Sequence, residues 1–155
     1  MLGALVSCGS QPVKNPNSAT LQNTKHKDAN TSMSAMFKAI NKEQLKVGSF
    51  TTPNQAAHNV NPGPAYIYAY VTLSGKEFPT VNAADYIFEA ELKSGETYSL
   101  KPTLKGKCIE IYLESKSGEK KGPFIQPWFD FDSPQRYMSV MSIESNELSS
   151  KQCSG

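Results

Sequence analysis

The sequence feature that most constrains the fold is a two-residue alternation of side-chain character that begins at residue 65. In residues 65–73, small or aliphatic side chains alternate with tyrosine and threonine, so the two kinds would lie on opposite faces of an extended strand. Residues 86–92 and 107–115 alternate in the same way, with glutamates on the polar side. This period indicates strands that bury one face, because a helix would bring every third or fourth residue to one side.

Turn-forming residues separate these alternating segments. Turns are expected at 93–96, 102–106 and 117–118, where Gly, Ser, Pro and Lys gather. Further strands are expected at 97–101, 124–131 and 137–143. Five to seven short strands without helices between them predict a mainly β domain, folded as a small antiparallel β-sandwich or barrel. A sequence of 155 residues has room for one such domain.

The N-terminal part of the chain follows other patterns. Residues 8–31 are rich in Ser, Asn, Thr, Gln, Pro and Lys and are expected to form a flexible tether, because they bury too little apolar surface to offset their ordering entropy. In residues 32–46, apolar side chains recur at helical spacing and predict one short amphipathic helix, which would cover the sheet or dock on a partner. The β-rich domain would then span 32–155, with its core at 47–145. The helical positions are Met33, Met36, Phe37, Ile40 and Gln44.

A motif near the N-terminus bears on where the protein works. Leu5-Val6-Ser7-Cys8 resembles the lipobox of bacterial lipoproteins, which has an aliphatic residue three positions before the cysteine and small residues just before it. The resemblance implies that the Cys8 thiol receives a diacylglyceryl group, and that residues 1–7 are removed as the remnant of a signal peptide. Few residues precede the box, and none is Lys or Arg, so we expect the natural signal to begin further upstream.

The lipobox resemblance also implies a location. Several acyl chains on Cys8 would anchor the protein stably, since a single chain binds a membrane only marginally. In this family an aspartate after the cysteine favours retention in the inner membrane, and this chain has Gly9 there. The resemblance therefore implies a lipid-anchored protein of the cell envelope, on the outer membrane and facing the periplasm. The membrane is its first implied partner.

A second, shorter resemblance concerns the domain itself. Residues 92–100, Leu-Lys-Ser-Gly-Glu-Thr-Tyr-Ser-Leu, are similar to a hairpin of small exported β-sandwich modules, in which a glycine turn precedes a Tyr-x-Leu strand. The similarity implies a fold type and no activity, because such sandwiches host many functions.

The chain has three cysteines, so in an exported protein one of them would be left without an intramolecular disulfide partner. If Cys8 carries lipid, Cys108 and Cys153 remain to form a disulfide. That bond would close a loop of about 46 residues and stabilise the fold by about 4 kcal/mol through loop-closure entropy. In a reducing compartment the two thiols would stay free, so the pairing depends on export.

Composition and motifs restrict the function further. A net charge of +2 with 19% charged residues is too balanced for a dedicated nucleic-acid binder. Of the two histidines, His26 lies in the expected tether, so a hydrolytic triad would have to use His58, and the sequence has no Gly-x-Ser-x-Gly elbow. Asp130 and Asp132 could bind calcium or act as acid and base, but their place beside Pro134 favours a role in a turn. We predict no cofactor, no metal site and no enzymatic activity.

Aromatic side chains form the candidate binding surface. Tyr66, Tyr68 and Tyr70, hereafter the tyrosine stripe, share one face of the expected strand, and Trp128 is the only tryptophan. Exposed aromatic rings suit the recognition of sugars or peptides. Alternatively, this strand is central and the tyrosines are covered by the predicted helix or the C-terminal tail.

The sequence therefore predicts a non-enzymatic, lipid-anchored envelope protein whose β-domain binds an envelope protein or a glycan. Two alternatives stay open. One is a small envelope hydrolase that uses His58 or the Asp130/Asp132 pair, which would need a concave pocket with a second polar group in hydrogen-bonding reach. The other is a purely structural lipoprotein without a ligand.

Overall fold

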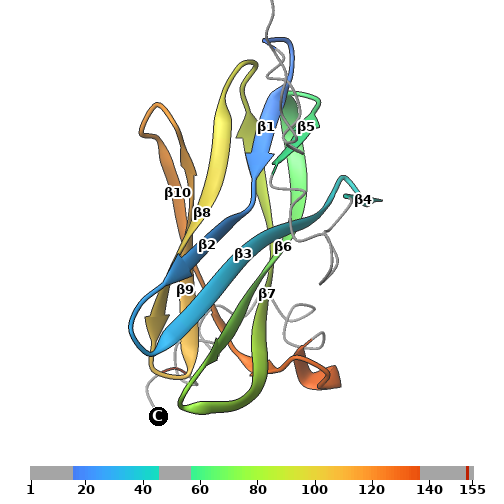
Figure 1. The fold of residues 1–155 in the computed structure, drawn as a ribbon. Coiled ribbons are helices and arrows are strands. Elements are labelled where there is room, and N and C mark those ends of the chain that lie inside the picture. The colour runs from blue at the N-terminus through green and yellow to red at the C-terminus, as the bar shows by residue number, and fades with distance from the viewer. Residues whose placement is uncertain (1–15, 46–56, 137–152, 154–155) are drawn as a thin grey trace, which may run out of the picture.

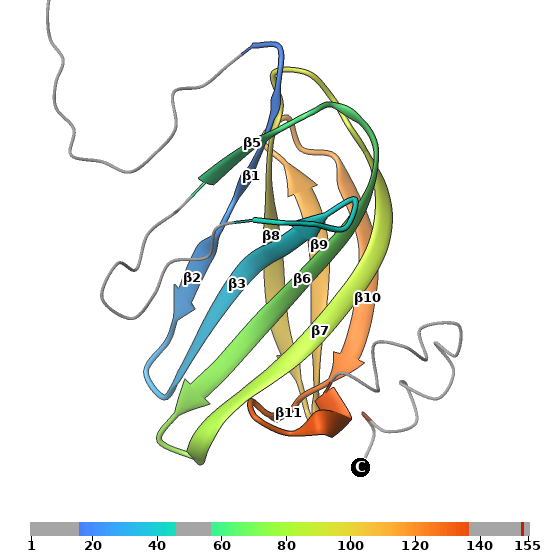
Figure 2. The same ribbon diagram turned by 90° about the vertical axis from the view of Figure 1, so that its right-hand side faces the viewer.

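Two β-sheets pack face to face in a computed structural model that describes residues 16–45, 57–136 and 153 (Figures 1 and 2). We name them the β8 sheet, with five strands, and the β6 sheet, with six. Across the β8 sheet the strands are β10 (Lys120–Pro127), β9 (Cys108–Ser115), β8 (Thr97–Lys105), β1 (Ala19–Gln22) and β5 (Ala57–Val60). Across the β6 sheet they are β11 (Phe129–Asp130), β7 (Phe78–Leu92), β6 (Gly63–Gly75), β3 (Thr31–Ile40) and β2 (Thr24–Lys27), with β4 (Glu43–Gln44) paired to β3.

The predicted mainly β fold is confirmed, and its form is a sandwich. The strands pair in antiparallel fashion, except that β1 runs parallel to β8. The expected alternation sets the orientation of the central strand β6, because its aliphatic positions are fully buried and its tyrosines lie on the outer face. The side chains of β6 that have no exposure are Ile67, Ala69, Val71 and Leu73.

Aromatic side chains of β7 link the two sheets across the core. The hydroxyl of Tyr86 donates a hydrogen bond to the carbonyl of Ile109 on β9, at 2.5 Å. Burial raises the pKa of Tyr86 well above its ordinary value, so the hydroxyl keeps its proton and stays a donor. The ring of Phe88 stacks on that of Phe124 from β10, with centroids 4.5 Å apart. Both contacts fix how the β6 sheet lies on the β8 sheet.

The prediction of a flexible tether is wrong for the stretch from β1 to β2. This stretch changes sheets at Asn23, because β1 pairs with β8 and β5, whereas β2 pairs with β3. The side chain of Asn23 accepts a hydrogen bond from the backbone N–H of Phe37 at 2.8 Å, which satisfies a donor at the crossing. The stretch needs few apolar residues because its backbone is hydrogen-bonded into both sheets, and Ala19 and Leu21 alone reach the core from β1. The domain thus begins before residue 32.

The prediction of a helix over 32–46 is wrong for the described part of that segment. The segment forms β3, then a tight turn at Asn41 and Lys42 with positive φ at both residues, then β4. The register against β6 shifts between Phe37 and Ala39, which is a β-bulge. The extra residue puts Phe37 and Ile40, three positions apart, on the same buried face. The bulge therefore accounts for the spacing of Phe37 and Ile40, two of the positions from which the helix was predicted.

The prediction of a hairpin over 92–100 is wrong, because the two strands that flank the turn do not pair with each other. The turn after Leu92 joins β7 of the β6 sheet to β8 of the β8 sheet, so it links the layers and does not pair neighbouring strands. The backbone N–H of Lys93 donates to the hydroxyl of Tyr98 at 2.8 Å and closes this corner. The glycine turn and the Tyr-x-Leu strand thus mark a sheet-to-sheet connection.

The predicted disulfide is present in the structure. Cys108, at the start of β9 and fully buried, is bonded to Cys153, with the two Cα atoms 5.1 Å apart. Cys8 and the rest of residues 8–15 of the expected tether, residues 46–56 and the expected strand at 137–143 lie outside the described residues. Within the described residues no helix has the length and the apolar character that crossing a bilayer would require.

Candidate binding site on the outer face of the β6 sheet

The outer face of the β6 sheet brings the tyrosine stripe beside acidic residues of β7. The register places Tyr70 directly opposite Asp85 and Tyr66 directly opposite Glu89. Directly opposed residues of antiparallel strands have Cβ atoms about 5 Å apart, so each of these tyrosines has a carboxylate as its immediate neighbour. Two positions of the face, four residues apart on each strand, thus carry the same kind of pair, a tyrosine beside a carboxylate.

The first of these positions contains a buried ion pair. Asp85 is fully buried, and Arg136, in the turn after β11, has a side chain only 2% exposed. The guanidinium binds the carboxylate with two bonds, from Nε at 2.5 Å and from Nη2 at 3.1 Å. The hydroxyl of Tyr68 donates to the same carboxylate at 3.1 Å. The charges are therefore well compensated, as a buried pair requires.

Aromatic rings enclose the guanidinium of Arg136. It lies 5.3 Å from the ring centroid of Tyr70 and 4.4 Å from that of Phe131, and its Nη1 donates to the carbonyl of Phe131 at 2.9 Å. The turn that carries it follows β11, at one end of β7 (Figure 2). Cation–π attraction and the bidentate ion pair together fix this turn over the stripe.

A cation also lies over the ring of the middle tyrosine, Tyr68. The ammonium of Lys38 lies 4.9 Å from the ring centroid of Tyr68. Lys38 is the extra residue at the bulge of β3, between the positions that pair with Ala69 and Tyr68. The bulge therefore directs this lysine over the outer face, a common effect of such irregularities.

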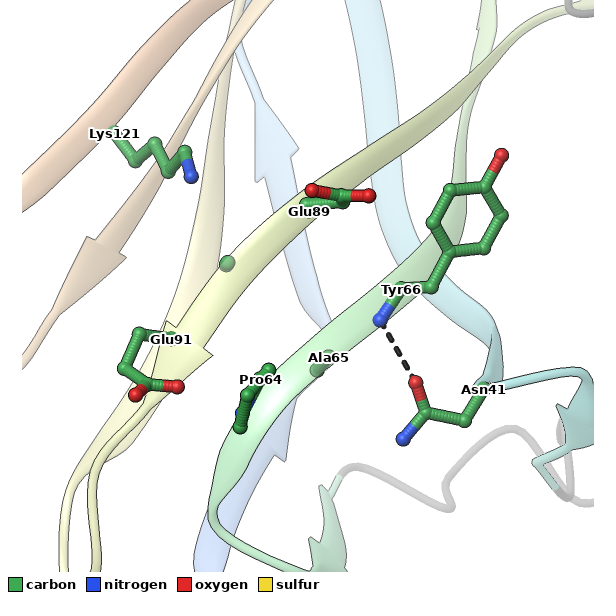
Figure 3. A pocket seen from close by; sticks show the side chains of 8 residues that line it. Asn41, Pro64, Ala65, Tyr66, Glu89, Glu91 and Lys121 are labelled. Atoms are coloured by element: carbon green, nitrogen blue, oxygen red, sulfur yellow. Dashed lines mark hydrogen bonds between the residues drawn. The ribbon is translucent and has the colours of Figure 1, made fainter.

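The last tyrosine is open to solvent. Tyr66 is 47% exposed, more than any other tyrosine in the described part of the chain. It borders a solvent-exposed depression of about 500 Å³ (Figure 3). We name this hollow the Tyr66 depression. Its polar and aromatic lining consists of Asn41, Tyr66, Glu89, Glu91 and Lys121, and Pro64 also borders it. Glu89 and Glu91 project from β7 on the same side, and Lys121 approaches from β10 of the other sheet (Figure 3).

Asn41 fixes one wall of the Tyr66 depression. The side-chain oxygen of Asn41 accepts a hydrogen bond from the backbone N–H of Tyr66 at 2.9 Å. The backbone N–H of Asn41 donates to the carbonyl of Tyr66 at 2.8 Å. Asn41 has a φ of 49°, and asparagine tolerates this left-handed backbone better than most residues. The two bonds attach the β3–β4 turn to β6 beside the exposed ring.

The charged groups of the Tyr66 depression form no hydrogen bonds or ion pairs within the described residues. Neither carboxylate, of Glu89 or of Glu91, takes part in a hydrogen bond or ion pair there, and the same holds for the ammonium of Lys121. The depression thus combines an open aromatic ring, two carboxylates and one ammonium, all available to a ligand. This is the pattern of a binding surface that places a few polar groups around an aromatic anchor.

The structure places Trp128 elsewhere. Its ring packs edge-to-face against Phe78, with centroids 5.4 Å apart, and its Nε1 donates to the carbonyl of Gly106 at 3.2 Å. Both rings lie against the hydrophobic core and are partly buried. Of the four aromatic residues that the sequence offered as a surface, the three tyrosines are brought together, and Tyr66 is the most accessible.

The residues of the hydrolase alternative lie outside the Tyr66 depression. His58 is buried on β5, where burial lowers its pKa, and its Nε2 has no partner within the described residues. Asp130 is exposed and accepts from the hydroxyl of Thr80 at 2.8 Å and from the backbone N–H of Asp132 at 3.1 Å, which lowers its pKa. These are the bonds of a turn-forming aspartate. In the part of the chain that the structure describes, no group of three potential metal ligands occurs.

Sequence reasoning missed most residues of this face. Asp85 had a detectable signal, because a charged residue directly follows two alanines and precedes Tyr86. Arg136, Asn41 and Lys121 had none, since each reaches the face from a different element through the tertiary fold. Glu89 and Glu91 were assigned only to the outward side of their strand.

Comparisons of the chain with protein-family models, with curated proteins and with solved structures find no match. The function is therefore inferred from the lipobox resemblance and from the geometry of the outer face of the β6 sheet.

Proposed function

We propose that this protein is a non-enzymatic, lipid-anchored envelope protein whose β-sandwich binds another envelope component through the outer face of the β6 sheet. The single observation that supports binding most strongly is the Tyr66 depression, where an exposed aromatic ring adjoins two carboxylates without partners in the described residues. An open aromatic surface suits binding better than catalysis, because it leaves its polar groups in contact with water.

The anchor and the location are proposed from the lipobox and the cysteines. Cys108 and Cys153 are paired, which leaves Cys8 as the cysteine for lipid attachment. Disulfides persist in oxidising compartments, and the periplasm is one. The protein would thus be attached to the outer membrane through Cys8 and present its sandwich to the periplasm.

Photo-crosslinking from the Tyr66 depression tests the binding face. The full chain, with an intact signal restored upstream, is expressed with the photoreactive residue p-benzoylphenylalanine in place of Tyr66. We expect irradiation of cells to give a discrete adduct, because the introduced ring occupies the centre of the proposed contact. Mass spectrometry of the adduct identifies it as protein or glycan.

The matched control carries the same photoreactive residue in place of Thr103, an exposed position of β8 on the other sheet. This variant should give only background. Equal adducts from both positions, or none from position 66, would contradict the proposed face, and absence at both would favour the purely structural alternative.

A separate experiment tests the anchor. Cells expressing the full chain with its upstream signal are fed an alkyne analogue of palmitate, and the purified protein is examined for label. We expect label on the wild type and complete loss in Cys8→Ser, because the thiol is the attachment atom. The control Cys153→Ala removes a different cysteine and should keep the label. An unlabelled wild type would refute the lipid anchor without affecting the binding face.

A further inference from the structure

We propose that the Tyr66 depression binds an arginine side chain of a partner protein, with Glu89 and Glu91 pairing with the guanidinium and the Tyr66 ring lying against it. The assignment rests on the proposed function, because it names the ligand of the same face. We infer arginine as the ligand because the other two tyrosines of the same face already lie against cations.

Two of the three tyrosine positions already bind cations from this chain. The ring of Tyr70, beside the carboxylate of Asp85, takes the guanidinium of Arg136, and the ring of Tyr68 takes the ammonium of Lys38. An aromatic face attracts a cation through its quadrupole, and an adjacent carboxylate adds a charge-assisted hydrogen bond. The rings and carboxylates on the outer face of β6 thus favour the binding of cations.

The third position repeats the first but has no occupant among the described residues. Tyr66 lies opposite Glu89 as Tyr70 lies opposite Asp85, and the two positions are four residues apart on each strand. Glu91 adds a second carboxylate, opposite Pro64. A guanidinium offers five donors in a planar fork, so it can satisfy two neighbouring carboxylates and stack on a ring at the same time.

The 155 residues contain no second arginine that could occupy the depression. Arg136 is the only arginine in the sequence, and it is buried against Asp85. A second copy of this chain would have its one arginine buried in the same way. We accordingly assign the occupant to an arginine of a different protein of the cell envelope.

Substitution of Lys121 can distinguish a cationic ligand from a neutral one. Its ammonium borders the depression and is the one positive charge among the lining residues, against two negative charges. An arriving cation would be repelled by Lys121, whereas a sugar would gain a hydrogen-bond donor from it. Removing this lysine should therefore strengthen arginine binding and weaken glycan binding.

The test is an NMR titration of the 155-residue chain with the peptide acetyl-Gly-Arg-Gly-amide. We expect the backbone amides of Tyr66, Glu89 and Glu91 to shift on titration. The same peptide with citrulline, which replaces the guanidinium by a neutral group of the same shape, should bind at least about tenfold more weakly. Glu89→Gln combined with Glu91→Gln should weaken arginine binding by about tenfold, and Lys121→Gln should strengthen it about twofold.

The matched control is Glu110→Gln combined with Glu114→Gln, on the outer face of β9. These two glutamates flank Tyr112 in the other sheet, so the control removes the same charge without touching the depression. It should leave arginine binding unchanged. Equal binding of the citrulline peptide, or equal loss in the control variant, would overturn the assignment.

A second probe separates failure of this assignment from failure of the proposed function. If the trisaccharide of N-acetylglucosamine shifts the amides of the depression and the arginine peptide does not, the ligand is a glycan. If neither probe shifts them, the arginine assignment is also wrong. In either case the photo-crosslink from position 66 decides separately whether this face binds an envelope component.

Discussion

Replacing Asp85 with alanine is expected to lower the free energy of unfolding by about 3–5 kcal/mol. The substitution leaves the guanidinium of Arg136 buried without its counter-charge and removes the acceptor of the Tyr68 hydroxyl. Equilibrium unfolding in urea measures the loss, with fluorescence of the single tryptophan, Trp128, as the probe. We expect a lower midpoint with an unchanged slope, since the folded and unfolded states expose the same surface as before.

A double variant distinguishes an unpaired charge from lost packing. Asp85→Leu combined with Arg136→Met replaces both charges by apolar side chains of similar size and should recover most of the loss, to within about 1.5 kcal/mol of wild type. If Asp85→Ala alone costs less than about 1 kcal/mol, the pair does not stabilise the fold and the turn after β11 is held by other contacts. If the double variant is no better than the single one, packing and not charge accounts for the effect.

Breaking the Cys108–Cys153 disulfide is expected to lower the free energy of unfolding by about 4 kcal/mol. The two cysteines are separated by 45 positions, and the bond restricts the unfolded chain by closing this long loop. The measurement compares urea unfolding of the oxidised protein with that of the Cys108→Ala/Cys153→Ala variant.

Cys153→Ala alone is the control for the buried position of Cys108. It opens the loop but leaves the side chain of Cys108 in the core. If loop closure is the cause, the single variant, the double variant and the reduced wild type should lose nearly the same free energy. A loss below about 1 kcal/mol in the single variant, with a large loss in the double variant, would assign the effect to packing of Cys108.

The candidate site could be predicted only in part. The tyrosine stripe followed from the alternation, because a period of two places Tyr66, Tyr68 and Tyr70 on one face whatever the neighbours are. Which of them is accessible did not follow, since exposure depends on Arg136 and Lys38, residues that reach the face from a turn and from a bulge. The lipid anchor at Cys8 stays a prediction from the sequence.

The errors in the N-terminal part have a common physical origin. The helix was expected because five side chains from Met33 to Gln44 recur at helical spacing. A bulge in β3 accounts for part of that pattern, since it places Phe37 and Ile40, three residues apart, on one buried face. The tether was expected because 8–31 has few apolar residues. Ala19 and Leu21 nevertheless occupy the core, where hydrogen bonds to β8 and β5 hold their strand in place.

The sequence by itself determined most of β6 and β9 and the second half of β7, with their buried faces, because side-chain period is a local property of the chain. The cysteine count, together with the lipobox, also predicted the two cysteines that pair. Only the tertiary structure decided the sheet order, the switch of sheets at Asn23 and the charges that meet on the β6 sheet. Asp85 and Arg136 are 51 positions apart, and Tyr66 and Lys121 come from different sheets. Such encounters depend on how distant strands pair, and no local pattern of residues records that pairing.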